Sequence, residues 1–308
     1  MHERAHNAIS LVIEIARDGD RLRKIRRDIA ILQQQLAARD RDIAALKKWL
    51  AGREVAVLGQ QIATEYNVSG FLDPEDHMLG HFIRADGIKK GIQIYFRGGK
   101  ADAEKLLELM KLFGMNEKDS RVFEFASGYG RITRHFTKRC NVTASDIHPA
   151  AVEMIKLRLK TPAYVSSHGP YELSIPGQYD LVFAISLFSH LPDATFGSWI
   201  AALLSLTKPN GLLLFTTHGP KGRQIFPELP PPGPDGIGFI PLSEQTDLDG
   251  HRYGTTTVTP EYVRQKIVSV GGELVSYDEI EWWGFQDQWI VRRPQSTSPD
   301  SDQICNLT

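Results

Sequence analysis

The segment Arg121–Phe136 constrains the fold more than any other part of the chain. It joins an apolar run, Val122 to Phe125, to a loop that holds Gly128 and Gly130 and then to the start of a helix. The apolar residues Val122, Phe123 and Phe125 are typical of a central parallel strand, which is buried on both faces. Glycines let the loop turn sharply and approach a ligand that a Cβ atom would push away. We therefore expect a parallel α/β sheet with a small-molecule site on this loop.

The residues around the loop narrow the class of ligand. Asp146 closes a second apolar stretch, 141–145, where a doubly wound sheet places the acid that binds ribose hydroxyls, so we expect a nucleoside. A dinucleotide fingerprint needs a third glycine where this chain has Thr133, which disfavours NAD. A phosphate-binding P-loop needs Gly-Lys-Ser/Thr where the chain has Gly130-Arg131-Ile132, which disfavours ATP.

The loop resembles the first motif of class I S-adenosylmethionine-dependent methyltransferases. The acid-x-Gly-x-Gly-x-Gly pattern of that family is present as Glu124-x-Ala126-x-Gly128-x-Gly130. Ala126 departs from it, and alanine fits there only if the backbone keeps a negative φ. From about Tyr95 to Arg293 the order of elements also resembles the family. This resemblance implies a doubly wound, Rossmann-like seven-stranded sheet with an antiparallel C-terminal hairpin, S-adenosylmethionine as cofactor and S-adenosylhomocysteine as product.

Hydrophobic runs and turn signals give the individual elements. Strands are expected at 122–125, 142–145, 163–166, 179–186, 212–218, 273–280 and 288–292, and helices at 101–113, 131–138, 150–159, 193–206 and 260–270. Their alternation predicts a parallel sheet covered on both faces. The long segment 219–259, which is rich in proline and glycine, follows the fifth strand. We interpret it as an irregular substrate lid, with plain disorder as the alternative.

The N-terminal region carries a heptad stripe interrupted only by Arg39. The apolar residues of the stripe are Leu22, Ile25, Ile29, Leu32, Leu36, Ile43, Leu46 and Leu50. They predict a coiled-coil helix over 1–53 through which the chain forms a homo-oligomer, although the stripe could instead pack on the chain's own domain. A connector and cofactor-covering helical segment (54–114), the methyltransferase-like domain (115–293) and a flexible tail (294–308) complete the expected organisation.

Composition excludes several classes of function. The 308 residues include 42% hydrophobic and 24% charged residues with a net charge of -1, so a general affinity for nucleic acid is not expected. The two cysteines form no disulfide framework, no metal-ligand spacing is apparent, and no apolar run reaches membrane-spanning length. We expect a cytoplasmic protein that binds no metal.

Candidate site residues come from the loop, from the strand ends and from the family resemblance. Those expected to bind the cofactor are Tyr95, Arg97, Glu124, Ala126, Ser127, Gly128, Gly130, Arg131, Asp146, Ile147, Ser167 and Ser186. A hydroxyl acceptor would need a base, for which we consider His218 first and then His190, with Asp287 orienting the acceptor. For each histidine a structural role is an equal alternative.

The acceptor itself is suggested by resemblance alone. The segments 238–245, 253–256 and 283–287 resemble a bacterial subgroup linked with sugar modification, so a sugar or other small-molecule hydroxyl is expected. A non-catalytic binding or assembly protein on the same fold, and an NAD-dependent oxidoreductase, are the competing functions. Methyl transfer would exclude the first of these, and a preference for S-adenosylhomocysteine over NADH would exclude the second.

Overall fold

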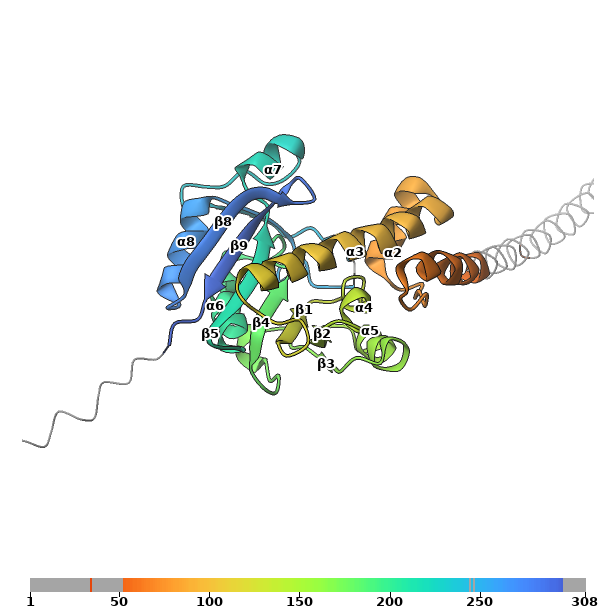
Figure 1. Ribbon diagram of the computed structural model, residues 1–308. Helices are drawn as coiled ribbons and strands as arrows, with labels where there is room; N and C mark the ends of the chain where they lie inside the picture. Colours follow the sequence, from red (N-terminus) through yellow and green to blue (C-terminus); the bar gives the residue numbers. More distant parts are fainter. Residues whose placement is uncertain (1–33, 35–51, 244, 246, 296–308) are drawn as a thin grey trace, which may run out of the picture. The chain divides into compact units, whose positions relative to one another are not determined.

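A computed structural model describes residues 34, 52–243, 245 and 247–295 (Figure 1). The chain divides into two units, 1–55 and 56–308. Within the first unit the described residues are helical, and the helix that includes residue 52 continues to residue 66. All apolar residues of the predicted heptad stripe lie outside the described residues, as does most of the predicted tail.

The second unit is built on a seven-stranded sheet with the strand order β3-β2-β1-β4-β5-β9-β8 (Figure 1). The strands are β1 (Arg121–Phe125), β2 (Asn141–Asp146), β3 (Ala163–Val165), β4 (Tyr179–Ala184), β5 (Thr207–Thr217), β8 (Glu273–Trp282) and β9 (Gln286–Arg292). Strands β1 to β5 pair in parallel, whereas β9 pairs antiparallel with β5 and β8. The predicted Rossmann-like α/β sheet with a C-terminal hairpin is therefore confirmed.

Both faces of the central strands are buried, which explains why most of their residues are apolar. In β1, Val122 packs in the cluster formed with α3 (Ile88–Leu112), and Phe123 packs in the cluster formed with α6 (Asp193–Ser205) and α8 (Pro260–Ser269). Successive side chains of a strand point to opposite faces, so helices on both sides of the sheet bury alternate residues.

The helix predicted at 101–113 is only the second half of α3. The sequence Gly98-Gly99 suggests a break, but the helix runs through it. A Cβ atom on Gly99 would lie 2.3 Å from the carbonyl oxygen of Arg131, so this glycine lets α3 contact the glycine loop directly. A shorter helix, α2 (His77–Asp86), precedes α3 and is capped by the Asp76 carboxylate, which accepts from the N–H groups of Met78 and Leu79.

The helix after β1 is shorter than predicted, whereas the helical segment after β2 covers the predicted range. Helix α4 covers only Thr133–Phe136, and α5 (Pro149–Met154) continues as the π-helical turn η1 (Ile155–Leu159). A short 3-10 helix, η2 (Pro170–Glu172), lies between β3 and β4.

The segment 219–259 is not irregular throughout. It contains α7 (Pro220–Ile225) and an antiparallel pair, β6 (Ile237–Ile240) and β7 (Thr255–Val258). The N–H of Thr256 donates to the Ser189 carbonyl at 2.8 Å, and that of Val258 donates to the His218 carbonyl at 2.9 Å. The small hairpin is thereby bonded to the carboxyl ends of β4 and β5, where ligands bind in sheets of this type.

In the described part of the chain, no helix has the length and apolar character that crossing a membrane requires.

Candidate functional site

The glycine loop after β1 turns through three left-handed residues. Gly128 has φ +53°, and a Cβ atom placed on it would meet nothing within 4 Å, so the loop leaves space there. Gly130 has φ +72°, and its Cβ would lie 2.5 Å from Leu159 Cδ1, so close packing requires glycine at this position. Ala126 has φ +57°, which corrects the expectation of a negative φ. The left-handed conformation costs an L-residue roughly 1 to 2 kcal/mol.

Glu124 lies beneath the loop and not at its surface. The side chain is buried, and its Oε2 accepts a 2.5 Å hydrogen bond from the Thr133 hydroxyl. Burial raises the pKa of the Glu124 carboxyl to about 8, so the neutral acid predominates at pH 7. Thr133 occupies the place of the third glycine and ties α4 to β1 through this bond. We place Glu124 in support of the loop.

Asp146 ends β2 beside the loop, as predicted, but its carboxylate has three protein donors. Oδ2 accepts from the Gly128 N–H at 2.7 Å, and Oδ1 accepts from the backbone N–H and the Nδ1 of His148, both at 2.9 Å. The other ring nitrogen of His148 lies 2.8 Å from Asp247 Oδ2 in the 219–259 segment. His148 thus bridges the strand end to the insertion, a contact that sequence reasoning missed.

Arg134, which sequence reasoning also missed, holds the glycine loop through buried hydrogen bonds. Its guanidinium is buried, and all five of its N–H donors have acceptors. Those acceptors are the carbonyls of Ser69, Phe71, Tyr129 and Gly130 and the hydroxyl of Tyr95. The Tyr95 hydroxyl in turn donates to Asp76 at 2.7 Å. Tyr95 therefore belongs to a buried network that positions the loop, whereas Arg97 is exposed on α3.

Arg131 forms a second link between the loop and its surroundings. Its guanidinium is paired with the buried Asp102 of α3 at 2.6 Å and lies 5.5 Å from the ring centroid of Trp283. The Trp283 indole N–H donates to Asp102 Oδ1 at 3.0 Å. The loop, α3 and the β8–β9 turn are joined at this point.

Ser186 begins a polar network at the carboxyl ends of β4 and β5. The Thr216 hydroxyl donates a hydrogen bond to Gln286 Oε1 at 2.7 Å. This bond orients the Gln286 amide so that its nitrogen lies 2.9 Å from Ser186 Oγ and 3.2 Å from His218 Nε2. The lone pair of His218 Nε2 thus faces a donor, which places the ring proton on Nδ1, a buried atom without a hydrogen-bond partner. Burial, with His190 nearby, lowers the pKa of His218 to about 4.

His190 lies close to His218 but is held differently. Its Nδ1 donates to the Gly254 carbonyl at 2.7 Å, and its ring stacks on Tyr253 with centroids 4.3 Å apart. A proton on Nδ1 puts the ring's lone pair on Nε2, the form in which a neutral imidazole accepts a proton. Both contacts come from the insertion.

Asp287 lies on the opposite side of β9 from the Gln286 side chain, because neighbouring residues of a strand alternate. Its buried carboxylate accepts from the Ile280 N–H at 2.9 Å and from the Tyr277 hydroxyl at 3.2 Å. Burial raises the pKa of this carboxyl. These contacts give Asp287 a role in holding the hairpin, and its carboxylate also lies against the backbone of Gly219, the residue after His218.

The remaining candidates lie around the loop and β3. The Ser127 N–H and hydroxyl both donate to the Ser145 carbonyl. The Ser167 hydroxyl donates to the Gly169 carbonyl. Ile147 is half-buried directly after Asp146. The described residues contain no group of three or more His, Cys, Asp or Glu side chains that could hold a metal ion.

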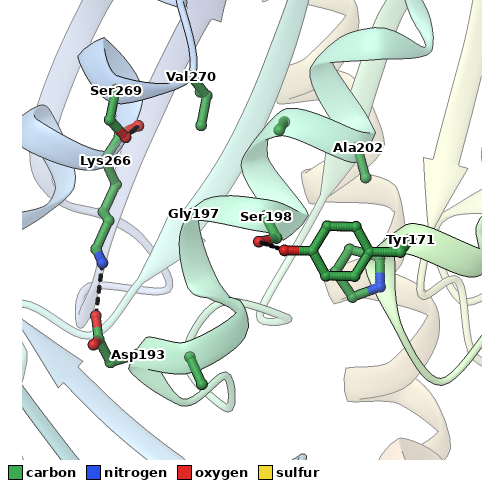
Figure 2. Close-up of a pocket in the computed structure, with 11 residues that line it drawn as sticks. Tyr171, Asp193, Gly197, Ser198, Ala202, Lys266, Ser269 and Val270 are labelled. Atoms are coloured by element: carbon green, nitrogen blue, oxygen red, sulfur yellow. Dashed lines mark hydrogen bonds and ion pairs between the residues drawn. The ribbon is translucent and has the colours of Figure 1, made fainter.

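A separate open groove of about 500 Å³ runs along α6, between η2 and α8 (Figure 2). Lys266 pairs with Asp193 at 2.7 Å, and the Tyr171 hydroxyl bonds to Ser198 Oγ at 2.7 Å. Its charged and aromatic polar groups are therefore engaged with each other, and none of the sequence-predicted site residues lines it. We assign it no ligand.

Comparison of the sequence and of the fold with known proteins finds similar methyltransferases. Residues 98–248 match the model of a methyltransferase domain family. No curated protein sequence matches the chain. Among solved structures, an S-adenosylmethionine-dependent methyltransferase from Clostridium acetobutylicum ATCC 824 is similar with a TM-score of 0.50 and 12% identity, over 71% of this chain and 97% of that one.

Two further solved structures are similar at lower scores. The magnesium protoporphyrin IX methyltransferase ChlM from Synechocystis PCC 6803 has a TM-score of 0.47 and 16% identity, over 70% of this chain and 93% of that one. The glycopeptide N-methyltransferase MtfA has a TM-score of 0.46 and 16% identity, over 64% of this chain and 87% of that one.

Proposed function

We propose that this chain, which has the class I methyltransferase fold and whose residues 98–248 match the model of a methyltransferase domain family, transfers a methyl group from S-adenosylmethionine to a hydroxyl of a small molecule. The observation that carries the proposal is the space in front of Gly128 beside the Asp146 carboxylate. A nucleoside could lie against the loop there, with a ribose hydroxyl donating to Asp146.

The residues present fit this cofactor. A carboxylate has about four lone-pair positions. Three of these positions on Asp146 accept hydrogen bonds from Gly128 and His148, which leaves one for a ribose hydroxyl. A second hydroxyl can bind if the His148 ring turns away. Arg134 and Arg131 hold the loop without projecting a charge into the space, so the backbone and Asp146 provide the recognition.

S-adenosylmethionine, when bound, supplies a methyl group that its sulfonium already activates. The protein then has to align the acceptor, keep water away and remove the hydroxyl proton. The insertion is bonded to the ends of β4 and β5, and we infer from this placement that it covers the side on which the acceptor would enter. His190 is the better base of the two histidines, since its Nδ1 proton is fixed on Gly254 and its lone pair is on Nε2. The Nε2 of His218 faces the Gln286 amide, and its lowered pKa weakens it as a proton acceptor.

Ligand binding tests the proposal directly. S-adenosylhomocysteine should stabilise the full chain in a thermal scan, and NADH should not. Asp146→Ala should weaken S-adenosylhomocysteine binding by roughly tenfold to a hundredfold, because a charged hydrogen-bond acceptor contributes about 1.5 to 3 kcal/mol. Calorimetry measures the loss, and Asp119→Ala, an exposed aspartate before β1, is the matched control. An unchanged dissociation constant in Asp146→Ala would refute the assignment.

A further inference from the structure

Three partly exposed aromatic side chains form a continuous strip beside His218, which lies near His190. Phe226 follows α7, and its ring lies 5.1 Å from that of Phe285 in the β8–β9 turn. Phe285 lies 6.1 Å from the His218 ring and 5.8 Å from the Trp283 ring. The strip therefore runs from His218 to Trp283, whose indole borders Arg131 of the glycine loop.

The strip is held rigidly. A Cβ atom on Gly222 would lie 2.2 Å from the Phe285 carbonyl oxygen, so α7 packs directly on the hairpin turn and fixes Phe226 against Phe285. Trp283 has φ +54°, an unfavourable conformation for a bulky residue, and the bond to Asp102 holds it there. Residues held in such backbone conformations cluster at ligand sites.

Despite this rigidity the rings are not fully covered. Phe226 retains 36% and Trp283 38% of its surface exposed, and Phe285 is half-buried. Exposed apolar surface that is contiguous and beside a candidate site points to a ligand with an apolar face.

Apart from the buried Nδ1 of His218, which has no hydrogen-bond partner, the polar groups along the strip are already engaged. The Trp283 N–H is bonded to Asp102, and the Gln286 amide is bonded to Thr216 and Ser186 and faces His218. A sugar ring lying on the strip would place several hydroxyls against aromatic carbon with few partners, and a polar group buried without a partner costs free energy. A planar aromatic ring requires only the ring contacts.

Building on the proposed function, we propose that the methyl acceptor is an aromatic ring compound whose phenolic hydroxyl is methylated while its ring lies on Phe226, Phe285 and Trp283. The phenolic oxygen gains the methyl group and loses its proton to His190 Nε2. The electron pair of the broken carbon–sulfur bond stays on sulfur, which gives S-adenosylhomocysteine. A phenol suits an imidazole base, since its pKa near 10 is far lower than that of a sugar hydroxyl.

The test uses the full chain saturated with S-adenosylhomocysteine and a matched pair of ligands, 2-naphthol and its saturated counterpart decahydro-2-naphthol, measured by calorimetry. We expect 2-naphthol to bind roughly two- to tenfold more tightly, the range that aromatic contacts add beyond burial of area. Phe226→Leu, which keeps an apolar side chain but removes one of the three rings, should weaken that preference. Tyr171→Ala, which removes an 87% exposed aromatic on the α6 groove, should leave it unchanged.

Equal binding of the two ligands, or a preference that is undiminished in Phe226→Leu, overturns this inference. The affinity for S-adenosylhomocysteine, measured first for each protein, separates the two proposals. If it binds and the ring preference is absent, the aromatic acceptor fails alone. If it does not bind, the proposed function fails.

Discussion

At the scale of single residues, the two histidines at the ends of β4 and β5 differ in what their ring nitrogens contact. His190 donates from Nδ1 to a backbone carbonyl, whereas His218 directs Nε2 at the Gln286 amide. The sequence alone favours His218, because it follows the fifth strand immediately before the insertion. The network that orients Gln286 reverses this preference, and no local pattern predicts that network, since Thr216 and Gln286 are 70 residues apart.

His190→Ala should lower the single-turnover rate of methyl transfer about 100- to 10,000-fold, the range that a positioned base contributes. His218→Ala should change acceptor binding or stability and leave the rate near that of the unmodified protein. Rapid-quench measurements with a phenolic acceptor would compare the two, with S-adenosylhomocysteine affinity as the control for an intact cofactor site. Near-normal rates in both variants would show that alignment without a base suffices.

Other residue-scale features are partly visible in the sequence. The glycine loop and Asp146 are found from spacing, and the structure places them side by side. The positive φ of Ala126 is not predictable from its residue type, because an L-residue ordinarily avoids it. Asp102 and Trp283 were missed for another reason: they are 181 residues apart, and only the folded chain brings them together.

At the scale of elements, glycines in α3 mislead a reading based on helix propensity. Gly98 and Gly99 are poor helix formers, yet the helix continues because Gly99 allows its backbone to lie against the Arg131 carbonyl. Tertiary packing therefore overrides a local signal. The insertion shows the same limit, since β6 and β7 are short and far apart along the chain, and their pairing depends on support from the ends of β4 and β5.

The bridge from Asp146 through His148 to Asp247 links the insertion to β2. A neutral imidazole has one N–H, so both carboxylates are bonded only when His148 is protonated. The hydrogen bond with Asp146 accordingly raises the pKa of His148 to about 9, above its ordinary value of 6.5. A pKa raised in the folded state stabilises the protein fully below pH 6.5, and this contribution is lost as the pH rises through 9.

His148→Gln should therefore lower the unfolding temperature at pH 6 by more than at pH 8, and the deficit relative to the unmodified protein should disappear above about pH 9. Thermal scans across this range measure the difference between the two proteins, which cancels the titration of other groups. His77→Gln is the matched control, since His77 Nε2 is 3.5 Å from Asp247 and 44% of its side chain is exposed. A deficit that is constant with pH would mean that His148 contributes by packing and not by charge.

At the scale of the whole molecule, the sheet could be predicted because the central strands are mostly apolar and the connections carry turn signals. Val122 to Phe125 and Tyr179 to Ala184 each hold a single acidic residue among apolar ones, and the two strands pair in parallel, as is typical of buried strands. The antiparallel hairpin could be predicted from two strand patterns that are separated by a turn containing Gly284. All the candidate site residues lie in the unit 56–308.

Because the site lies within one unit, we propose that the first unit serves association. Deleting Met1–Arg53 should leave S-adenosylhomocysteine affinity unchanged and convert a homo-oligomer to a monomer, as the heptad stripe predicts. Light scattering measures the mass of both proteins. Leu32→Lys, on the stripe, should also dissociate the full chain, whereas Gln33→Lys, which lies off the stripe and changes the charge equally, should not. If the full-length and truncated chains are both monomers, the stripe packs on the chain's own domain, and the truncated protein should then lose thermal stability as well.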